Sequence, residues 1–172
     1  MQQPTCILTG FTLIMGMALS ATTVAADLPK EGTFSGTYAG AGTFLKTYPV
    51  GKERSLSLWE DNSFTVGKGF LDHMTWHCFG ISSITTGMEH FSGYCVVTDP
   101  AGDQIAADIT NDETIPADAK SRPAKGTFTT GTGKYAGISG TIKGECHAGD
   151  FRPVSAETYL DYCAPEGSSK LP

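Results

Sequence analysis

Short stretches of alternating apolar and polar residues, separated by glycines, are the feature that most constrains this chain. Lys125–His147, KGTFTTGTGKYAGISGTIKGECH, shows the pattern clearly, because two alternating segments flank a glycine-rich connection. Alternation with a period of two predicts β-strands, and clustered glycines predict the tight connections between strands. No long stretch has the periodicity of an amphipathic helix. The sequence therefore predicts an all-β protein.

The number and spacing of these segments predict how the strands are arranged. About eight segments follow one another, joined mostly by short links. Sequential hairpins favour antiparallel up-and-down topology, and eight strands suffice to close a barrel without exposed edges. We therefore predict a single calycin-like β-barrel, with a β-sandwich as the alternative. Side chains fill the interior of such a barrel, or it holds one small ligand.

Several segment boundaries can also be predicted. Arg54–Glu60 is expected to be a strand with its leucines on one face, and Asp61-Asn62 a turn into a short strand. The proline-containing segment Asn111–Lys125 is expected to be a long loop. Glu157–Cys163 is expected to be the last strand, followed by a frayed tail over Pro165–Pro172.

The N-terminal segment has the composition of an export signal. Met1–Ala26 contains no charged side chain, and Ile7–Ser20 is an apolar run shorter than a membrane-spanning helix requires. Ala25 or Ala26 fits the cleavage site of a signal peptide. We therefore predict a signal peptide over 1–26 and one secreted or periplasmic domain over 27–172. A retained N-terminal anchor is the alternative.

The cysteines agree with export. Loss of Cys6 with the signal leaves four cysteines, an even number that indicates two disulfides in an exported chain. Cys78 and Cys95 have the same separation as Cys146 and Cys163, and each pair brackets a plausible hairpin. The spacing therefore favours Cys78–Cys95 and Cys146–Cys163. Bridges between distant strands remain the alternative, because four cysteines allow three connectivities.

Charge and motif content make several kinds of partner improbable. The formal net charge of −6 argues against nucleic acid or an anionic membrane as the partner. His73 and His77 would lie roughly 13 Å apart on a strand, too far to share a zinc ion. The adjacent residues Glu89 and His90 would point to opposite faces. The chain also lacks the motifs of serine hydrolases, zinc proteases, P-loops and dinucleotide sites, so no metal or cofactor is predicted.

One element resembles a known group of proteins. Gly131–Gly140, GTGKYAGISG, together with Gly93–Cys95 and Thr98–Asp103, is similar to bacterial secreted proteins of the allene oxide cyclase barrel-like and dirigent-like group. The resemblance implies a calycin-type barrel. Allene oxide cyclases isomerise an epoxide fatty acid, and dirigent proteins direct phenoxy-radical coupling. None of their catalytic residues matches a position here, so the resemblance implies the fold and no activity.

Three functional hypotheses follow. The first is binding of a small hydrophobic or aromatic molecule in the lumen by aromatic side chains: Phe34, Tyr38, Trp59, Trp76, Phe91 and Phe128. The second is a cyclase or isomerase, which requires an ionisable group that points into a cavity: His77, His90, Glu89 or Asp108. The third is an interaction module or inhibitor that uses the Asn111–Lys125 segment.

Overall fold

The computed structural model describes residues 28–111, 114–147 and 157–172, so the predicted signal peptide lies outside the described residues. No helix in this part of the chain is long and apolar enough to cross a membrane. The described elements, in order, are β1 (Glu31–Val50), β2 (Arg54–Lys68), β3 (Thr75–Thr85), β4 (Met88–Thr98), β5 (Gln104–Thr110), β6 (Ile115–Pro116), β7 (Ser121–Gly131), the 3-10 helix η1 (Gly133–Tyr135), β8 (Ser139–His147) and β9 (Thr158–Lys170).

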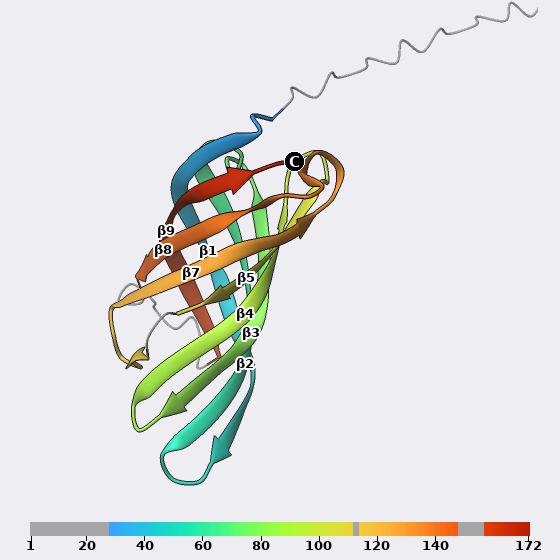
Figure 1. The fold of residues 1–172 in the computed structure, drawn as a ribbon. Coiled ribbons are helices and arrows are strands. Elements are labelled where there is room, and N and C mark those ends of the chain that lie inside the picture. The colour runs from blue at the N-terminus through green and yellow to red at the C-terminus, as the bar shows by residue number, and fades with distance from the viewer. Residues whose placement is uncertain (1–27, 112–113, 148–156) are drawn as a thin grey trace, which may run out of the picture.

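Eight of these strands form a closed antiparallel ring. Each strand pairs with the next along the chain, β5 pairs with β7, and β9 pairs with both β8 and β1. The two-residue strand β6 pairs with the start of β4 as an addition to the ring. In Figure 1 the β1–β2 and β3–β4 hairpins lie at one end, and the C-terminus lies at the other. The predicted up-and-down barrel is confirmed, and ring closure excludes the β-sandwich.

Two disulfides link neighbouring strands of the barrel. Cys78 of β3 is bonded to Cys95 of β4, and Cys146 of β8 is bonded to Cys163 of β9. The partners face each other directly in the strand register, with a Cα–Cα distance of 4.0 Å in both pairs. These are the pairs that the equal spacing favours.

The interior near the C-terminal end is filled by side chains. The Phe34 ring lies 5.0 Å from the Phe70 ring and 5.8 Å from the Phe128 ring, measured between centroids. Tyr135 of η1 packs against Phe70 and is 2% exposed. Buried aliphatic and sulfur-containing side chains complete this apolar cluster: Leu71, Met74, Val97, Ile105 and Ile138. This end of the barrel is therefore solid.

Strand β2 differs from the expectation in length and in orientation. It continues through Asp61-Asn62 without a turn. Its inward face carries Trp59 and Asp61, whereas Leu58 is 40% exposed. Alternation identifies two faces but not which one is buried. Here the buried face is the one that carries Trp59, Asp61 and Ser63, and its two small polar residues lie opposite glycines of β1. The leucine face therefore lies outside the barrel.

Two further expectations about chain ends and loops were wrong. The tail from residue 165 is not frayed, because β9 extends to Lys170, which pairs with Glu31 of β1 and Ser139 of β8. The Asn111–Lys125 segment is not one long loop, because β7 begins at Ser121 and includes Pro123. In both segments, pairing with distant strands supplies the order that local sequence does not indicate.

Candidate functional site

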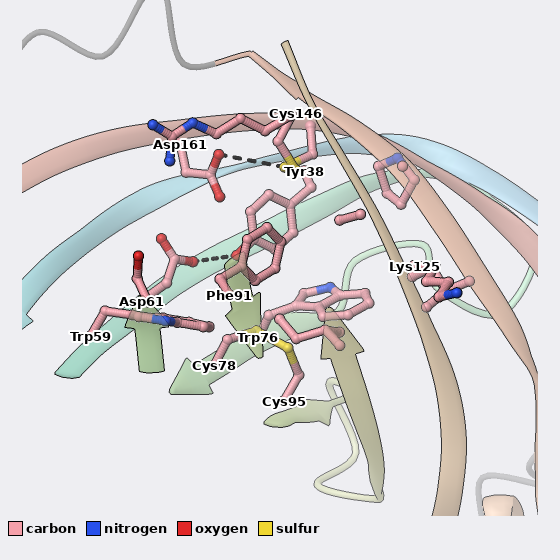
Figure 2. Close-up of a pocket in the computed structure, with 18 of the residues that line it drawn as sticks. Tyr38, Trp59, Asp61, Trp76, Cys78, Phe91, Cys95, Lys125, Cys146 and Asp161 are labelled. Atoms are coloured by element: carbon pink, nitrogen blue, oxygen red, sulfur yellow. Dashed lines mark hydrogen bonds between the residues drawn. A yellow bond between two sulfur atoms is a disulfide. The ribbon is translucent and has the colours of Figure 1, made fainter. Parts of the chain in front are cut away.

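A cavity of about 320 Å³ occupies the barrel interior beyond the apolar cluster, toward the β3–β4 hairpin. Its walls are largely aromatic, and the two disulfides lie against it. Figure 2 shows side chains from several strands converging on this space. The aromatic lining residues are Tyr38, Phe44, Trp59, Trp76, Phe91 and Tyr159.

The structure separates the six predicted lumen residues into two groups. Tyr38, Trp59, Trp76 and Phe91 line the cavity. The other two, Phe34 and Phe128, belong to the apolar cluster and are not among the residues that line the cavity. All six occupy interior positions, as their alternation predicts, but alternation carries no information about depth along the barrel axis.

Glycines in β1 bring polar side chains of β2 and β9 together. Gly42 pairs with Asp61 of β2 on one side and with Tyr159 of β9 on the other. Gly40 pairs in the same way with Ser63 and Asp161. Because these glycines have no side chain, the neighbouring strands can place theirs over β1. A Cβ atom at Gly42 would lie 2.1 Å from the Tyr159 ring.

Asp61 is a buried carboxyl group bound to a buried tyrosine. Its exposed fraction is 2%, and its Oδ1 accepts a hydrogen bond from the Tyr38 hydroxyl. Burial raises the pKa of Asp61, and the hydrogen bond from Tyr38 partly opposes that effect. Burial and the nearby Asp61 charge also raise the pKa of Tyr38 well above its ordinary value. Tyr38 therefore remains a neutral hydrogen-bond donor.

Asp161 lies near Asp61 and titrates close to neutrality. Burial, followed by the charge of Asp61, raises the pKa of Asp161 to about 7. Its Oδ1 lies 3.4 Å from Cys163 Sγ. Figure 2 shows the Asp61 and Asp161 side chains directed toward the same region beside Tyr38. The cavity thus holds two carboxyl groups, and the charge of Asp61 disfavours the ionisation of Asp161.

Asp161→Asn is expected to stabilise the protein above pH 7. A pKa of about 7 in the folded state, against about 3.8 when unfolded, means that the folded state binds more protons between these values. Wild-type stability should therefore fall as pH rises from 4 to 7, by up to about 4 kcal/mol. The asparagine variant should lack this loss, as measured by urea unfolding at pH 5 and pH 8.

The matched control for this change is Asp108→Asn, because Asp108 is exposed on the outward face of β5. The control should keep the wild-type dependence of unfolding free energy on pH. Parallel pH profiles for wild type and Asp161→Asn would contradict the assignment of this dependence to Asp161.

Glu89 and Arg122 form an ion pair inside the barrel. Arg122 Nη1 lies 2.7 Å from Glu89 Oε2, and Ser82 donates a hydrogen bond of 2.5 Å to Glu89 Oε1. Arg122 Nη2 also donates to the Ala117 carbonyl at 2.8 Å, so β7 and the segment before it are tied to β4. Among the described residues neither Asp61 nor Asp161 has such a cationic partner. Glu89 is the ion-pair partner of Arg122, whose positive charge also lowers the pKa of Asp161.

The other ionisable residues considered from sequence lie outside the cavity. His77 and His90 are exposed, as is Asp108, whereas Glu89 points inward. His73 has a φ of 58° and lies before β3, with Nδ1 2.9 Å from Asp72 Oδ2. Glu89 is therefore the single member of this predicted set that reaches the lumen.

Sequence reasoning missed the polar residues that distinguish this cavity. The local sequence around Asp61 predicts a turn, and no sequence motif marks Asp161, Tyr159 or Arg122. A signal was present in β9, because Asp161 is two positions from Cys163 and must share its inward face. The inward direction of Asp61 has no comparable local signal. Cys146, Asp161 and Cys163 also cluster closely, but both sulfurs are held in a disulfide and offer no thiolate.

The chain matches no known protein family and no curated protein. Among solved structures it is similar to the pterocarpan synthase dirigent protein GePTS1, with a TM-score of 0.49 and 10% sequence identity. The similarity covers 81% of this chain and 86% of that one. A likeness of this degree says nothing about activity. The barrel assignment rests on the strand pairing of this chain itself.

Proposed function

We propose that this protein binds a small, mainly hydrophobic or aromatic molecule in the barrel lumen. The observation that carries the proposal is the cavity of about 320 Å³, with aromatic walls and a few buried polar groups. Pockets for small ligands typically have this size range, apolar walls and convergent polar groups. Export to an oxidising compartment is part of the proposal. The two disulfides support it, since such bonds persist mainly outside the cytosol.

The lumen offers a site that side chains have not filled. One end is solid, yet the aromatic side chains at the other end leave space between them. The ring centroids of Trp59 and Phe91 lie 6.3 Å apart, and those of Tyr38 and Trp76 lie 5.7 Å apart. Both pairs are arranged edge-on. Aromatic faces and edges presented in this way bind planar apolar groups.

Filling the cavity is expected to weaken binding of a neutral hydrophobic fluorophore, N-phenyl-1-naphthylamine. Gly144 lines the cavity, and a Cβ atom there would lie 3.4 Å from its nearest neighbours, an ordinary contact. Gly144→Leu should therefore occupy lumen space without displacing backbone and weaken binding about tenfold or more, roughly 1.4 kcal/mol. Fluorescence titration measures the affinity.

The control places the same side chain on the outside of the same strand. Thr141 is exposed on β8, so Thr141→Leu should leave fluorophore affinity unchanged. Ala124→Leu provides a second filling variant, because Ala124 also lines the cavity and pairs with Gly144. Equal affinity in the filling variants and the control would place the fluorophore outside the lumen and contradict the proposal.

A second candidate function is acid–base catalysis in the same cavity, as in a cyclase or isomerase. The observation that favours it is the carboxyl group of Asp161, whose pKa of about 7 suits proton exchange near neutral pH. To distinguish the two functions, a bound molecule is released from the protein and compared with the molecule that was added, by mass spectrometry and chromatography. Recovery of an unchanged ligand supports binding alone, and conversion to an isomer supports catalysis.

A further inference from the structure

We infer that the lumen selects a positively charged ligand, a small organic amine whose ammonium group sits beside Asp61 and Asp161 against the aromatic wall. This inference rests on the proposed binding function and specifies its ligand class. It follows from three features of the cavity: its carboxyl groups without ion-pair partners, one buried carboxylate oxygen without a hydrogen bond of normal geometry, and its aromatic rings.

The first feature is the charge balance of the lumen. Six inward titratable groups line the cavity: Tyr38, Asp61, Glu89, Arg122, Tyr159 and Asp161. Arg122 is paired with Glu89 and also bound to the Ala117 carbonyl. Among the described residues no ion pair involves Asp61 or Asp161. The charge of Arg122 lowers the pKa of Asp161 and the charge of His77 lowers the pKa of Asp61, but neither cation forms an ion pair with them. A bound ammonium would supply a direct ion-pair partner.

Two lysines at the cavity boundary do not alter this balance. Lys125 and Lys143 occupy outward, exposed positions of β7 and β8, alternating with the inward residues Ala124 and Gly144. Lys143 Nζ lies 2.9 Å from Glu166 Oε1 on the outer surface. Figure 2 shows Lys125 away from the two aspartates. The inward charge near Asp61 is therefore negative, which disfavours an anionic ligand.

The second feature is a buried carboxylate oxygen without a hydrogen bond of normal geometry. Asp61 Oδ2 is in this state among the described residues, although Asp61 is 98% buried and lines the cavity. Ser63, which is not among the lining residues, acts on Asp61 as a hydrogen-bonding neighbour and lowers its pKa. Buried polar atoms are almost always satisfied, so such atoms indicate a missing partner. An ammonium group donates up to three hydrogen bonds and suits neighbouring acceptors.

The third feature is the set of aromatic rings that line the same cavity as Asp61. Tyr38 is hydrogen-bonded to Asp61 and contacts the Trp76 ring edge-on at 5.7 Å. Trp59 precedes Asp61 by one inward position on β2. Aromatic faces attract cations, most strongly in sites removed from water. Carboxylates combined with such rings favour an organic cation over a hydrated metal ion.

Three probes of matched shape test the inference: 2-phenylethylamine, 2-phenylethanol and 3-phenylpropionate. At pH 7.5 isothermal titration calorimetry should show the amine binding at least tenfold more tightly than the alcohol, with the carboxylate weakest. Asp61→Asn and Asp161→Asn should each reduce the preference for the amine over the alcohol severalfold. Asp108→Asn, on the outer face, should leave that preference intact.

Proton release supplies a readout that a purely structural role would not change. Near pH 6.5 the amine should displace protons from Asp161, so its apparent binding enthalpy should depend on the ionisation enthalpy of the buffer. Asp161→Asn should remove that dependence. If Asp61→Asn does not fold, Asp161→Asn still allows the cation preference to be tested by this proton-release measurement.

The outcomes separate this inference from the binding function. If the alcohol or the carboxylate binds as tightly as the amine, or if the amine does not bind, the cation preference is overturned. Continued lumen binding of N-phenyl-1-naphthylamine would then leave the proposed function standing. Loss of lumen binding for that neutral fluorophore as well would overturn both.

Discussion

Removing both disulfides is expected to lower the free energy of unfolding by about 6 kcal/mol. Each bridge joins residues 17 positions apart, and closing a loop of that length in the unfolded chain contributes about 3 kcal/mol. The two loops do not overlap in sequence, so their contributions should add. Since a typical domain has a total stability of about 5–15 kcal/mol, the variant should be largely unfolded at 37 °C.

Urea unfolding of three alanine variants measures this effect. Cys78→Ala with Cys95→Ala and Cys146→Ala with Cys163→Ala should each lose about 3 kcal/mol, and the fourfold variant about twice that. Alanine is preferred to serine because Cys78 and Cys95 are almost fully buried. Wild type treated with reductant is the control and should match the fourfold variant. The prediction would be contradicted if the fourfold variant had the same free energy of unfolding as the wild type.

Gly40→Val is expected to destabilise the barrel by about 3 kcal/mol or more, at the upper end of overpacking effects. A Cβ atom at this position would lie 2.2 Å from Ser63 Cβ and 2.4 Å from the Asn62 carbonyl oxygen. The obstruction includes backbone, so the β1–β2 pair must separate to accept it. That separation would also move Asp61 and Ser63 relative to Asp161, and the preference for amines should fall.

The matched control is Gly32→Val on the same strand, where the nearest atom to an added Cβ is Pro29 Cγ at 3.9 Å. Thermal and urea unfolding should show little change for this control. Gly42→Val should be intermediate, because its obstruction is the Tyr159 side chain, which can move. Equal stability of the Gly40 and Gly32 variants would show that β1 and β2 tolerate a wider separation.

The chemistry of the cavity and the stability of the protein are expected to conflict at Asp161. Its replacement by asparagine should stabilise the folded protein above pH 7 and weaken its preference for amines. Destabilising groups are typical of functional sites, because the ligand supplies the interaction that the free protein lacks. The opposite signs of the two effects provide a further check on the assignment of the site.

The sequence by itself determined the class of fold and the local connections. Alternation and glycine spacing predicted an eight-stranded up-and-down barrel, because strand and turn preferences act over a few residues. A turn at Thr86-Gly87, with φ values of 49° and 77°, joins β3 and β4 within the hairpin that Cys78 and Cys95 bracket. Equal cysteine spacing indicated the bridges for the same reason, since each closes a hairpin of neighbouring strands.

Only the tertiary structure decided which face of β2 is buried, where β9 ends and which aromatic residues border a cavity. Asp61 points inward because β2 packs against Gly40 and Gly42, which are distant in sequence. β9 continues to Lys170 because closing the ring pairs it with β1 and β8. Phe34 and Tyr38 share one face of β1, yet Phe34 lies in the solid end and Tyr38 in the cavity. These outcomes depend on contacts between distant segments, and the alternation of residues within one strand carries no information about such contacts.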